Sequence, residues 1–351
     1  MTFTNSCDGY YKDSLDVRFT KMCDNNCPFC IEKGGITGKS TNVPAMIEAT
    51  KASGKSTVLI LGGEPFLLLP ELKKYIEGIY LFVKEIYITT SLPITIQENI
   101  DLFCEIADMV TGINISFQHY DDEKNNEIMH ASRPYKRTET LKKLCDMGYA
   151  DKFRVSINLV KGSIDTVEKI ESFLWTMENL GVKHVKINEL QHANDLYISF
   201  EKAYGIELPS PFSHGCQDTI SLPGHDLRIT LKRACFCVND GLKATLPDLC
   251  KAIIKQTTKK YCGSQIVLYE DGTLSDDPTQ GIVHAFLGDG SVLDSLQYAV
   301  VCGLEVLRRI DHVAAGTQCQ YCCLIGTIVI RDRCLVHGTG YDHTTEIQFI
   351  S

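Results

Sequence analysis

Three cysteines lie close together near the start of the chain, in the segment CDNNCPFC. Three residues separate Cys23 from Cys27, and two separate Cys27 from Cys30. A structural zinc site takes four ligands and a closed iron-sulfur cluster takes four thiolates, so this triplet is one ligand short of either. A cubane cluster held by three thiolates keeps one iron free to bind another molecule. The spacing therefore favours a cluster with an open iron, and the alternative is half of a zinc site or a redox pair.

A second motif follows the strand-like run at residues 57–61. It consists of Gly62, Gly63, Glu64 and Pro65. Glycine has no side chain and lets the backbone come close to a ligand. The motif therefore indicates a ligand at the end of this strand.

Together these two motifs resemble the signatures of the radical S-adenosylmethionine (SAM) enzymes, including the aromatic Phe29 directly before the last cysteine. The resemblance implies that Cys23, Cys27 and Cys30 hold a 4Fe-4S cluster whose fourth iron binds SAM. One electron from such a cluster cleaves SAM to methionine and a 5'-deoxyadenosyl radical, which abstracts hydrogen from a substrate. The resemblance also implies that Glu64, or backbone near it, receives the methionine ammonium of SAM.

Strand-like and helical patterns alternate along the first half of the chain. Strands are expected at residues 15–20, 57–61, 85–90, 112–118, 153–161 and 183–190, and helices at 43–53, 69–80, 96–107, 136–147 and 165–180. The charge run at residues 121–124 is expected to be a solvated loop. Six successive strand-helix units predict an α/β fold with a parallel sheet and right-handed crossovers.

The strands alternate apolar and polar residues, which is unusual for a parallel sheet covered on both faces. We therefore expect a partial (β/α)6 barrel of the TIM type, with a polar concave face and an active site at the carboxyl ends of the strands. By analogy with the radical SAM family, Ser116, Gln118 and Asn158 are candidates for the ribose and carboxylate of SAM, and Asn188 for its adenine. An ordinary polar strand residue is the alternative at each position.

The last ninety residues have a cysteine pattern of their own. Residues 266–269 form a strand-like run, and a turn with Gly272 follows. This layout resembles the Twitch or truncated SPASM appendage of radical SAM enzymes, which carries an auxiliary 4Fe-4S cluster; Asp277 stands where that pattern has a cysteine. The resemblance implies an appendage at residues 261–351, after a barrel at 1–195 and a connecting segment at 196–260. The implied metal ligands are Cys262, Cys319, Cys322, Cys334 and Asp277, with Cys323 as a substitute and scattered buried cysteines or a zinc site as the alternatives.

Composition limits the remaining function classes. The chain has 351 residues, 16 cysteines and a net charge of −9. An acidic balance offers no basic stripe for duplex nucleic acid, and no run is long enough for a membrane span. The first residues lack an apolar signal core, so we expect a reduced, cytoplasmic protein. The resemblance to radical SAM enzymes implies a reducing partner such as a flavodoxin or ferredoxin.

The resemblance implies a radical SAM enzyme, and we expect its substrate to be a small metabolite or a nucleotide-like molecule. Peptide maturases of this family usually carry a leader-binding domain, and fewer than 25 residues precede Cys23. A peptide maturase is therefore the first alternative, and a non-catalytic iron-sulfur electron carrier or redox sensor is the second.

Overall fold

The structure is a computed structural model, and it describes residues 14–30, 40–190, 195–207, 217–234 and 266–275. All of these belong to a compact unit at residues 1–290, and residues 291–351 form a second unit. Within the described ranges, no helix is both long enough and apolar enough to span a membrane.

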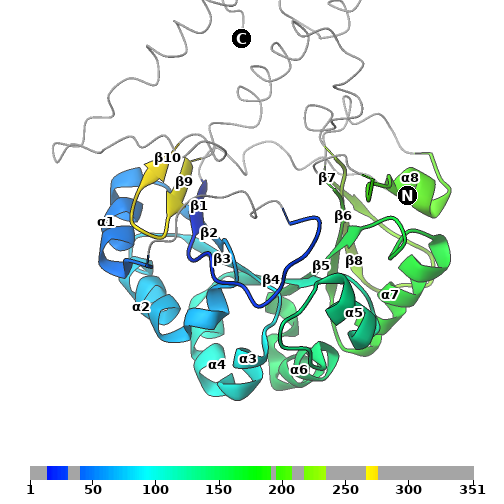
Figure 1. The fold of residues 1–351 in the computed structure, drawn as a ribbon, viewed down its shortest axis with the longest axis horizontal. Coiled ribbons are helices and arrows are strands. Elements are labelled where there is room, and N and C mark those ends of the chain that lie inside the picture. Colours follow the sequence, from blue (N-terminus) through cyan, green and yellow to red (C-terminus); the bar gives the residue numbers. More distant parts are fainter. Residues whose placement is uncertain (1–13, 31–39, 191–194, 208–216, 235–265, 276–351) are drawn as a thin grey trace, which may run out of the picture. The chain divides into compact units, whose positions relative to one another are not determined.

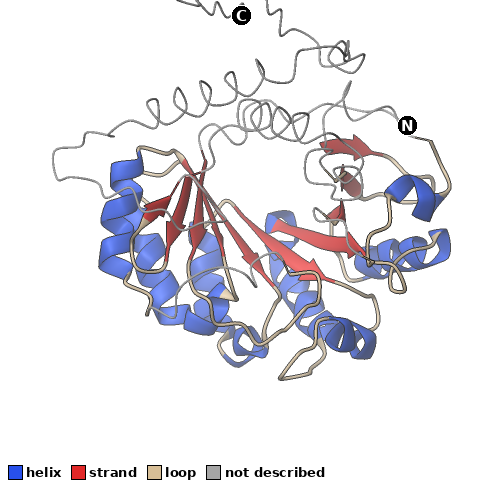
Figure 2. Cartoon of the chain, turned by 45° about the horizontal axis from the view of Figure 1, so that its top comes forward, coloured by secondary structure: helices blue, strands red, loops and turns tan. Residues whose placement is uncertain are grey.

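A single curved sheet organises the first unit, with helices along its convex side (Figures 1 and 2). Its order is β10-β9-β1-β2-β3-β4-β5-β6-β8-β7. Eight neighbouring strands are parallel: β9 (Ile266–Tyr269), β1 (Ser14–Arg18), β2 (Thr57–Leu61), β3 (Glu85–Thr90), β4 (Gly112–Phe117), β5 (Phe153–Leu159), β6 (His184–Glu189) and β8 (Arg228–Lys232). An antiparallel strand ends the sheet on each side: β10 (Leu274–Ser275) and β7 (Gln217–Ile220). The barrel is therefore partial and open, as the sequence predicted.

The helices follow the strands in the expected alternation. They are α1 (Val43–Ser53), α2 (Leu69–Ile79), α3 (Ile94–Glu98), α4 (Ile100–Met109), α5 (Asp122–Ile128), α6 (Arg137–Leu144), α7 (Val167–Asn179) and α8 (Phe200–Tyr204). Shorter helical turns lie at Pro65–Leu68, Cys145–Tyr149 and Ala150–Lys152. Side-chain caps fix several helix starts: Asn42 accepts from the amide of Ala45 at 3.3 Å, and Thr166 accepts from that of Lys169 at 3.4 Å.

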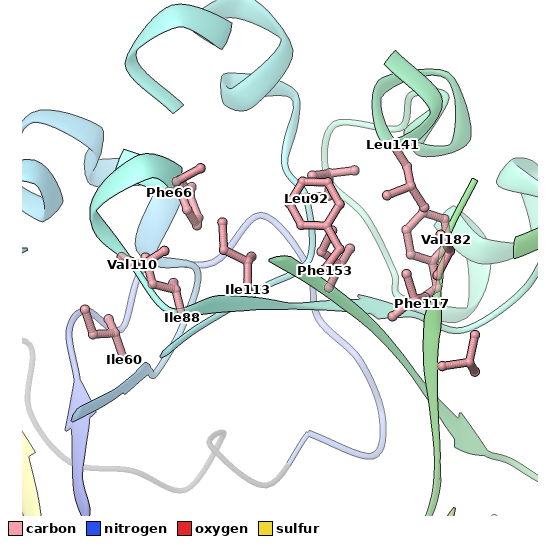
Figure 3. Packing of buried hydrophobic residues seen from close by; sticks show 14 of the residues in the cluster. Ile60, Phe66, Ile88, Leu92, Val110, Ile113, Phe117, Leu141, Phe153 and Val182 are labelled. Atoms are coloured by element: carbon pink, nitrogen blue, oxygen red, sulfur yellow. The ribbon is translucent and has the colours of Figure 1, made fainter. Parts of the chain in front are cut away.

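The hydrophobic core fills the space between the sheet and the helices (Figure 3). Strand residues such as Ile60, Ile88 and Ile113 face helical and loop residues such as Phe66 and Leu141, and all five are at most 1% exposed. Full burial of one such side chain stabilises the fold by about 1.5–3 kcal/mol. Because these apolar residues alternate along each strand, the polar residues between them lie on the concave face.

Two features differ from the sequence expectation. The charge run at residues 121–124 was expected to be a loop, but it begins α5, whose first turn is capped by Asp121 accepting from the amide of Lys124 at 3.0 Å. The sheet also continues beyond residue 195, because β8 pairs with β6 and β9 pairs with β1. The predicted division of the chain at residues 195 and 260 stays a prediction, but strands from both later segments belong to the barrel sheet.

Candidate active site

The three cysteines lie on a loop that leaves the carboxyl end of β1, here called the cysteine loop (residues 20–30). Cys23 and Cys30 are exposed and Cys27 is half-buried, and none of them forms a disulfide. The amide of Cys30 donates to the carbonyl of Cys27 at 3.2 Å, so the last two thiols share one turn. Because parallel strands place their carboxyl ends at one rim, the loop stands where a barrel active site is expected.

The GGEP motif pairs with the backbone of the cysteine loop. The amide of Gly63 donates to the carbonyl of Thr20 and that of Glu64 to the carbonyl of Met22, both at 2.6 Å. A Cβ on Gly63 would lie 2.2 Å from the Met22 carbonyl oxygen, and one on Gly62, where φ is 122°, would lie 2.7 Å from that of Thr20. Any side chain at either position would push the loop away. The glycines therefore permit a close approach between two backbones, and the predicted close approach to a ligand stays a prediction.

The carboxylate of Glu64 is buried and fully engaged with protein donors. Its Oε2 accepts from the amide and the hydroxyl of Ser91 at 2.6 and 2.7 Å. Its Oε1 accepts from the hydroxyl of Thr90 at 2.8 Å and from the amide of Phe66 at 3.1 Å. Burial raises the pKa of Glu64, and these four hydrogen bonds oppose the rise. The side chain thus joins the end of β2 to the end of β3, and its predicted contact with the SAM ammonium stays a prediction.

The segment after α5 holds the opposite side of the cysteine loop. The amide of Asn26 donates to the carbonyl of Met129 at 2.9 Å, and the thiol of Cys27 lies 3.6 Å from the same oxygen. Ser132 donates to the carbonyl of Asp24 through both its amide, at 2.7 Å, and its hydroxyl, at 2.9 Å. The loop is thereby fixed from two sides by elements that follow different strands.

Arg137, at the start of α6, connects the cysteine loop, the end of β3 and α5 through hydrogen bonds. Its side chain is completely buried, and its Nε donates to the carbonyl of Ser91 at 3.0 Å. Its guanidinium also donates to the Oδ1 of Asn25 at 3.2 Å and to the side chain of Asn126. Asn25 in turn donates to the Ser91 hydroxyl at 2.8 Å. We call this set, Glu64, Ser91, Asn25, Asp24 and Arg137, the loop floor.

Charge in the loop floor acts on the thiols above it. Although Cys23 is exposed, the protein around its sulfur partly desolvates it and raises its pKa to about 11; a hydrogen bond from the Asn25 amide opposes the rise, and the charges of Glu64, Asp24 and Cys30 add to it. Burial also raises the pKa of Asp24, and the positive charge of Arg137 opposes that rise. In the metal-free protein Cys23 is therefore a thiol at neutral pH, and binding a cluster releases its proton.

The predicted SAM-contacting residues lie in adjacent rows on the concave face. Ser116 of β4 is level with Ser156 of β5, and Asn158 of β5 is level with Asn188 of β6. Gln118, just after β4, is 3% exposed, and its side-chain oxygen has no hydrogen-bond partner among the described residues. An orphaned buried acceptor near the rim fits a ligand with hydrogen-bond donors, as SAM has.

The concave face of β5, β6 and β8 carries charge of one sign. Its cations are Arg154, Lys186, Arg228 and Lys232, which we call the basic face. Described side chains on the concave side of these three strands include no carboxylate. His184 lies among the cations and shares a hydrogen bond of 2.8 Å with Thr230. Its pKa falls to about 4, because of burial first and then the charges of Arg154, Arg228 and Lys186.

No group of three or more metal-ligating side chains converges as a single ion would require, within the part of the chain that the structure describes. Three thiolates of a cubane bind different irons, so they do not meet at one point, and the open spread of Cys23, Cys27 and Cys30 fits a cluster better than a lone metal. Other predicted ligands, namely Cys262, Cys319, Cys322, Cys334, Cys323 and Asp277, lie outside the described residues. The hairpin predicted beside them is present, with β9 and β10 joined through Gly272.

Comparison with known proteins agrees with this geometry. Residues 17–174 match the sequence profile of the family described as "Radical SAM superfamily". These residues form a radical SAM domain. The match supports an enzyme that contains a radical SAM domain at these residues, a domain whose family uses a 4Fe-4S cluster and SAM. Comparison with curated proteins gives no match.

Solved structures show the same fold. SuiB of Streptococcus suis bound to S-adenosylmethionine is 14% identical, with a TM-score of 0.53, over 83% of this chain and 68% of SuiB. SuiB bound to the precursor peptide SuiA gives 13% identity and a TM-score of 0.54, over 83% of this chain and 66% of SuiB. At this identity the likeness concerns the fold.

Two parts of the site were not found from the sequence. Arg137 appeared there as one of several charged residues at the start of a helix, and its partners Ser91 and Asn25 are far from it in the chain. The basic face was not predicted, because the pairing of β8 with β6 brings its cations together and this pairing was not predicted. Of the contacts that hold the cysteine loop, only those made by the GGEP motif had a sign in the sequence, namely the motif itself.

Proposed function

We propose that the chain reductively cleaves SAM at a 4Fe-4S cluster bound by Cys23, Cys27 and Cys30, and abstracts hydrogen from a small metabolite or nucleotide-like substrate. With cluster and SAM bound, one electron yields methionine and a 5'-deoxyadenosyl radical. The observation that carries this proposal is the fixing of the cysteine loop against GGEP at the barrel rim by the hydrogen bonds from Gly63 and Glu64.

The chain's own residues have three tasks in this proposal. The loop floor holds the three thiols at the rim, so that the cluster forms in one position. Ser116, Gln118, Asn158 and Asn188 line the concave face where SAM would lie, and polar contacts there would orient it. The surrounding barrel keeps water from the reacting groups. Electrons would come from a flavodoxin- or ferredoxin-like protein in a reducing cytoplasm.

A peptide substrate is the second candidate, because SuiB, which shares this fold, has been crystallised with the precursor peptide SuiA. The charge of the concave face favours a small anionic substrate over a peptide chain. A peptide maturase would bind through an extended backbone, which needs a free strand edge or groove. The basic face instead offers a compact group of cations.

We further propose an auxiliary cluster bound by Cys262, Cys319 and Cys322, with Asp277, Cys334 or Cys323 as the fourth ligand. The hairpin of β9 and β10 supports this layout, because Cys262 lies shortly before it and Asp277 shortly after it. A carboxylate is a harder and weaker ligand for cluster iron than a thiolate. Ligation by Asp277 would therefore make the auxiliary cluster labile.

One variant tests both clusters. In the reduced protein with SAM, replacing Cys23, Cys27 and Cys30 together by Ala should abolish release of 5'-deoxyadenosine while the circular dichroism of the fold is kept. Iron and sulfide analysis should fall from about eight to about four irons per chain, given a four-iron cubane at each site. Persistent SAM cleavage in this variant would refute the rim cluster. A variant with no iron-sulfur absorption at all, or with one bound zinc, would refute the auxiliary cluster.

A further inference from the structure

A backbone amide of the cysteine loop points at one of the three thiols. The amide of Asn25 donates to the Sγ of Cys23, with 3.4 Å between nitrogen and sulfur. Cys27 is placed differently, because its sulfur lies 3.6 Å from an acceptor, the carbonyl of Met129. The Asn25 amide is therefore a hydrogen-bond donor aimed at a sulfur that the proposed function assigns to the cluster.

The side chain of Asn25 holds this amide in place at three points. Its Nδ2 donates to the hydroxyl of Ser91 at 2.8 Å and to the Oδ1 of Asp24 at 3.1 Å. Its Oδ1 accepts from the guanidinium of Arg137 at 3.2 Å. All three partners are buried. A side chain whose donor and acceptor are both bonded to buried groups leaves its own backbone little freedom to turn away.

The direction of these hydrogen bonds is fixed by the groups that take part. Ser91 gives its hydroxyl proton to the Oε2 of Glu64 at 2.7 Å, so its oxygen is an acceptor towards Asn25. Arg137 has only donors, so it must face the oxygen of the Asn25 amide. A directed chain of hydrogen bonds thus runs from Asn25 through Ser91 to Glu64, and it ties the amide beside Cys23 to the ends of β2 and β3.

We propose that Asn25 is a positioning residue that raises the reduction potential of the cluster held by Cys23, Cys27 and Cys30, by keeping its backbone amide on the Cys23 sulfur. Hydrogen bonds to the sulfurs are among the factors that set the potential of an iron-sulfur cluster. Reduction adds negative charge that the sulfurs share, and a hydrogen bond to a more negative acceptor is stronger. The amide therefore favours the reduced form.

The step concerned is the transfer of one electron from a flavodoxin- or ferredoxin-like donor to the oxidised cluster. The donor is oxidised by one electron and the cluster is reduced by one. The amide proton stays on its nitrogen, and no covalent bond forms or breaks. This inference rests on the proposed function for the cluster itself, and it adds the residue that adjusts how easily the cluster accepts its electron.

The charges near Cys23 explain why a donor is useful there. The carboxylates of Glu64 and Asp24 both act on this cysteine, and negative charge near a cluster favours its oxidised form. One oxygen of Asp24 also has no hydrogen-bond partner among the described residues. The Asn25 amide and the cation of Arg137 act in the opposite direction, so the loop floor contains groups of both effects.

The test is a redox titration of the full-length, reconstituted protein without SAM, followed by electron paramagnetic resonance (EPR). The EPR signal that is lost when Cys23, Cys27 and Cys30 are all replaced by Ala reports the rim cluster. Asn25→Leu removes the three side-chain contacts at similar size and should make the cluster harder to reduce. The equilibrium constant for reduction should fall about threefold, which is about 30 mV for one electron, since tenfold is 59 mV.

Ser91→Ala and Thr90→Val form a matched pair of variants. Both hydroxyls are buried and both donate to Glu64, at 2.7 and 2.8 Å. Ser91 also accepts from Asn25, whereas Thr90 accepts from the amide of Leu92. Ser91→Ala should lower the potential in the same direction as Asn25→Leu and by less, and it decides the test alone if Asn25→Leu binds no cluster. Thr90→Val should keep the wild-type potential even where the free energy of unfolding falls.

Two results would overturn the role of Asn25. The first is a wild-type potential in both Asn25→Leu and Ser91→Ala, with the EPR signal of the rim cluster still present. The second is an equal shift in Ser91→Ala and Thr90→Val, which would trace the shift to a loosened fold. A wild-type protein with no EPR signal that depends on the three cysteines would refute the rim cluster, and with it both the proposed function and this inference.

Discussion

The loop floor and the basic face are both polar regions in contact with one curved sheet, but they differ in the signs of the charges that they contain. In the loop floor a buried cation, Arg137, lies among two buried carboxylates, and the four donors around Glu64 saturate its oxygens. On the basic face four cations gather with no described carboxylate on the same side of their strands. The first region combines charges of both signs that are mostly hydrogen-bonded within the chain, with one oxygen of Asp24 left without a partner among the described residues, and the second gathers charges of one sign.

This difference separates scaffold from binding site. A buried polar network whose members satisfy one another holds a single conformation, and losing one member leaves the rest unsatisfied. Substitutions in the loop floor should therefore destabilise the protein more than substitutions of the partly exposed cations on the basic face.

The largest expected effect comes from Arg137→Met. Removing this buried cation leaves the Ser91 carbonyl and the side-chain oxygens of Asn25 and Asn126 without their donor, and each buried acceptor left unsatisfied costs about 1–3 kcal/mol. The free energy of unfolding in urea, followed by circular dichroism, should fall by about that amount. Amide exchange in the cysteine loop of the metal-free protein should also become faster.

Arg133→Met is the matched control for this change. Arg133 is four residues earlier, half-exposed, and pairs with exposed Glu98 at 3.3 Å, so its loss should cost less than about 1 kcal/mol. If Arg137→Met and Arg133→Met had the same stability, the loop floor would not be the scaffold described above.

Glu64→Gln should have the next largest effect. The amide nitrogen of Gln would face donors, so at least one hydrogen bond to Ser91 or Thr90 would be lost, at a cost of about 1–3 kcal/mol. The metal-free protein should lose this stability before any SAM is added. Glu77→Gln, at an exposed position on α2, should leave it unchanged.

The same variant separates two roles for Glu64. If Glu64 positions the cysteine loop, Glu64→Gln should weaken SAM binding and also lower the stability of the metal-free protein. If Glu64 binds the SAM ammonium directly, Glu64→Gln should weaken SAM binding by roughly tenfold to a hundredfold and leave the stability of the metal-free protein unchanged. This range follows because a loss of about 1.4 kcal/mol in binding free energy is a tenfold loss of affinity. The second result would contradict the hydrogen bonds that occupy its carboxylate.

Local pattern predicted much of the fold. The predicted bounds of α1, β2 and β3 are those of the structure, because each is an uninterrupted periodic segment with a clear stop. α5 was missed because it is short and polar, so no apolar stripe marks it. The places of β8 and β9 in the sheet were missed as well, because strand pairing across many residues leaves no mark in either strand's own sequence.

The position of the site was predictable from the sequence, and its contacts were less so. The cysteines and GGEP were predicted at strand ends and the structure places both there, while the cluster itself stays a prediction. Their spacing does not reveal that Gly63 packs on Met22, because that contact joins two loops. A buried Arg137 was equally hidden, since its charge predicts exposure.

The smallest expected effect is on the pH dependence of stability, and it concerns two histidines: one lies among cations and the other between carboxylates. His184 among cations has a pKa near 4, whereas His225 lies between Glu171 and Glu178, at 2.8 and 3.1 Å. Burial lowers the pKa of His225, but hydrogen bonds and charge from the two carboxylates outweigh burial and raise it above its usual value. Asp226, whose amide donates to Glu178, is the other charged group beside it.

The sign of each contribution follows from these shifts. His225 binds its proton more tightly when folded, so its stabilisation is complete below about pH 6.5 and is lost as pH rises through the raised pKa. His184 has a lower pKa in the folded than in the unfolded chain, so its contribution to the free energy of unfolding falls as pH drops from about 6.5 towards 4. His225→Gln should therefore cost about 1 kcal/mol at pH 6 and less at pH 8.5. Trp175, the single tryptophan, lies 4.7 Å from the His225 ring and reports unfolding by fluorescence. His130→Gln, at an exposed position, is the control, and an equal loss at both pH values for His225→Gln would show that packing against Trp175, rather than charge, sets its contribution.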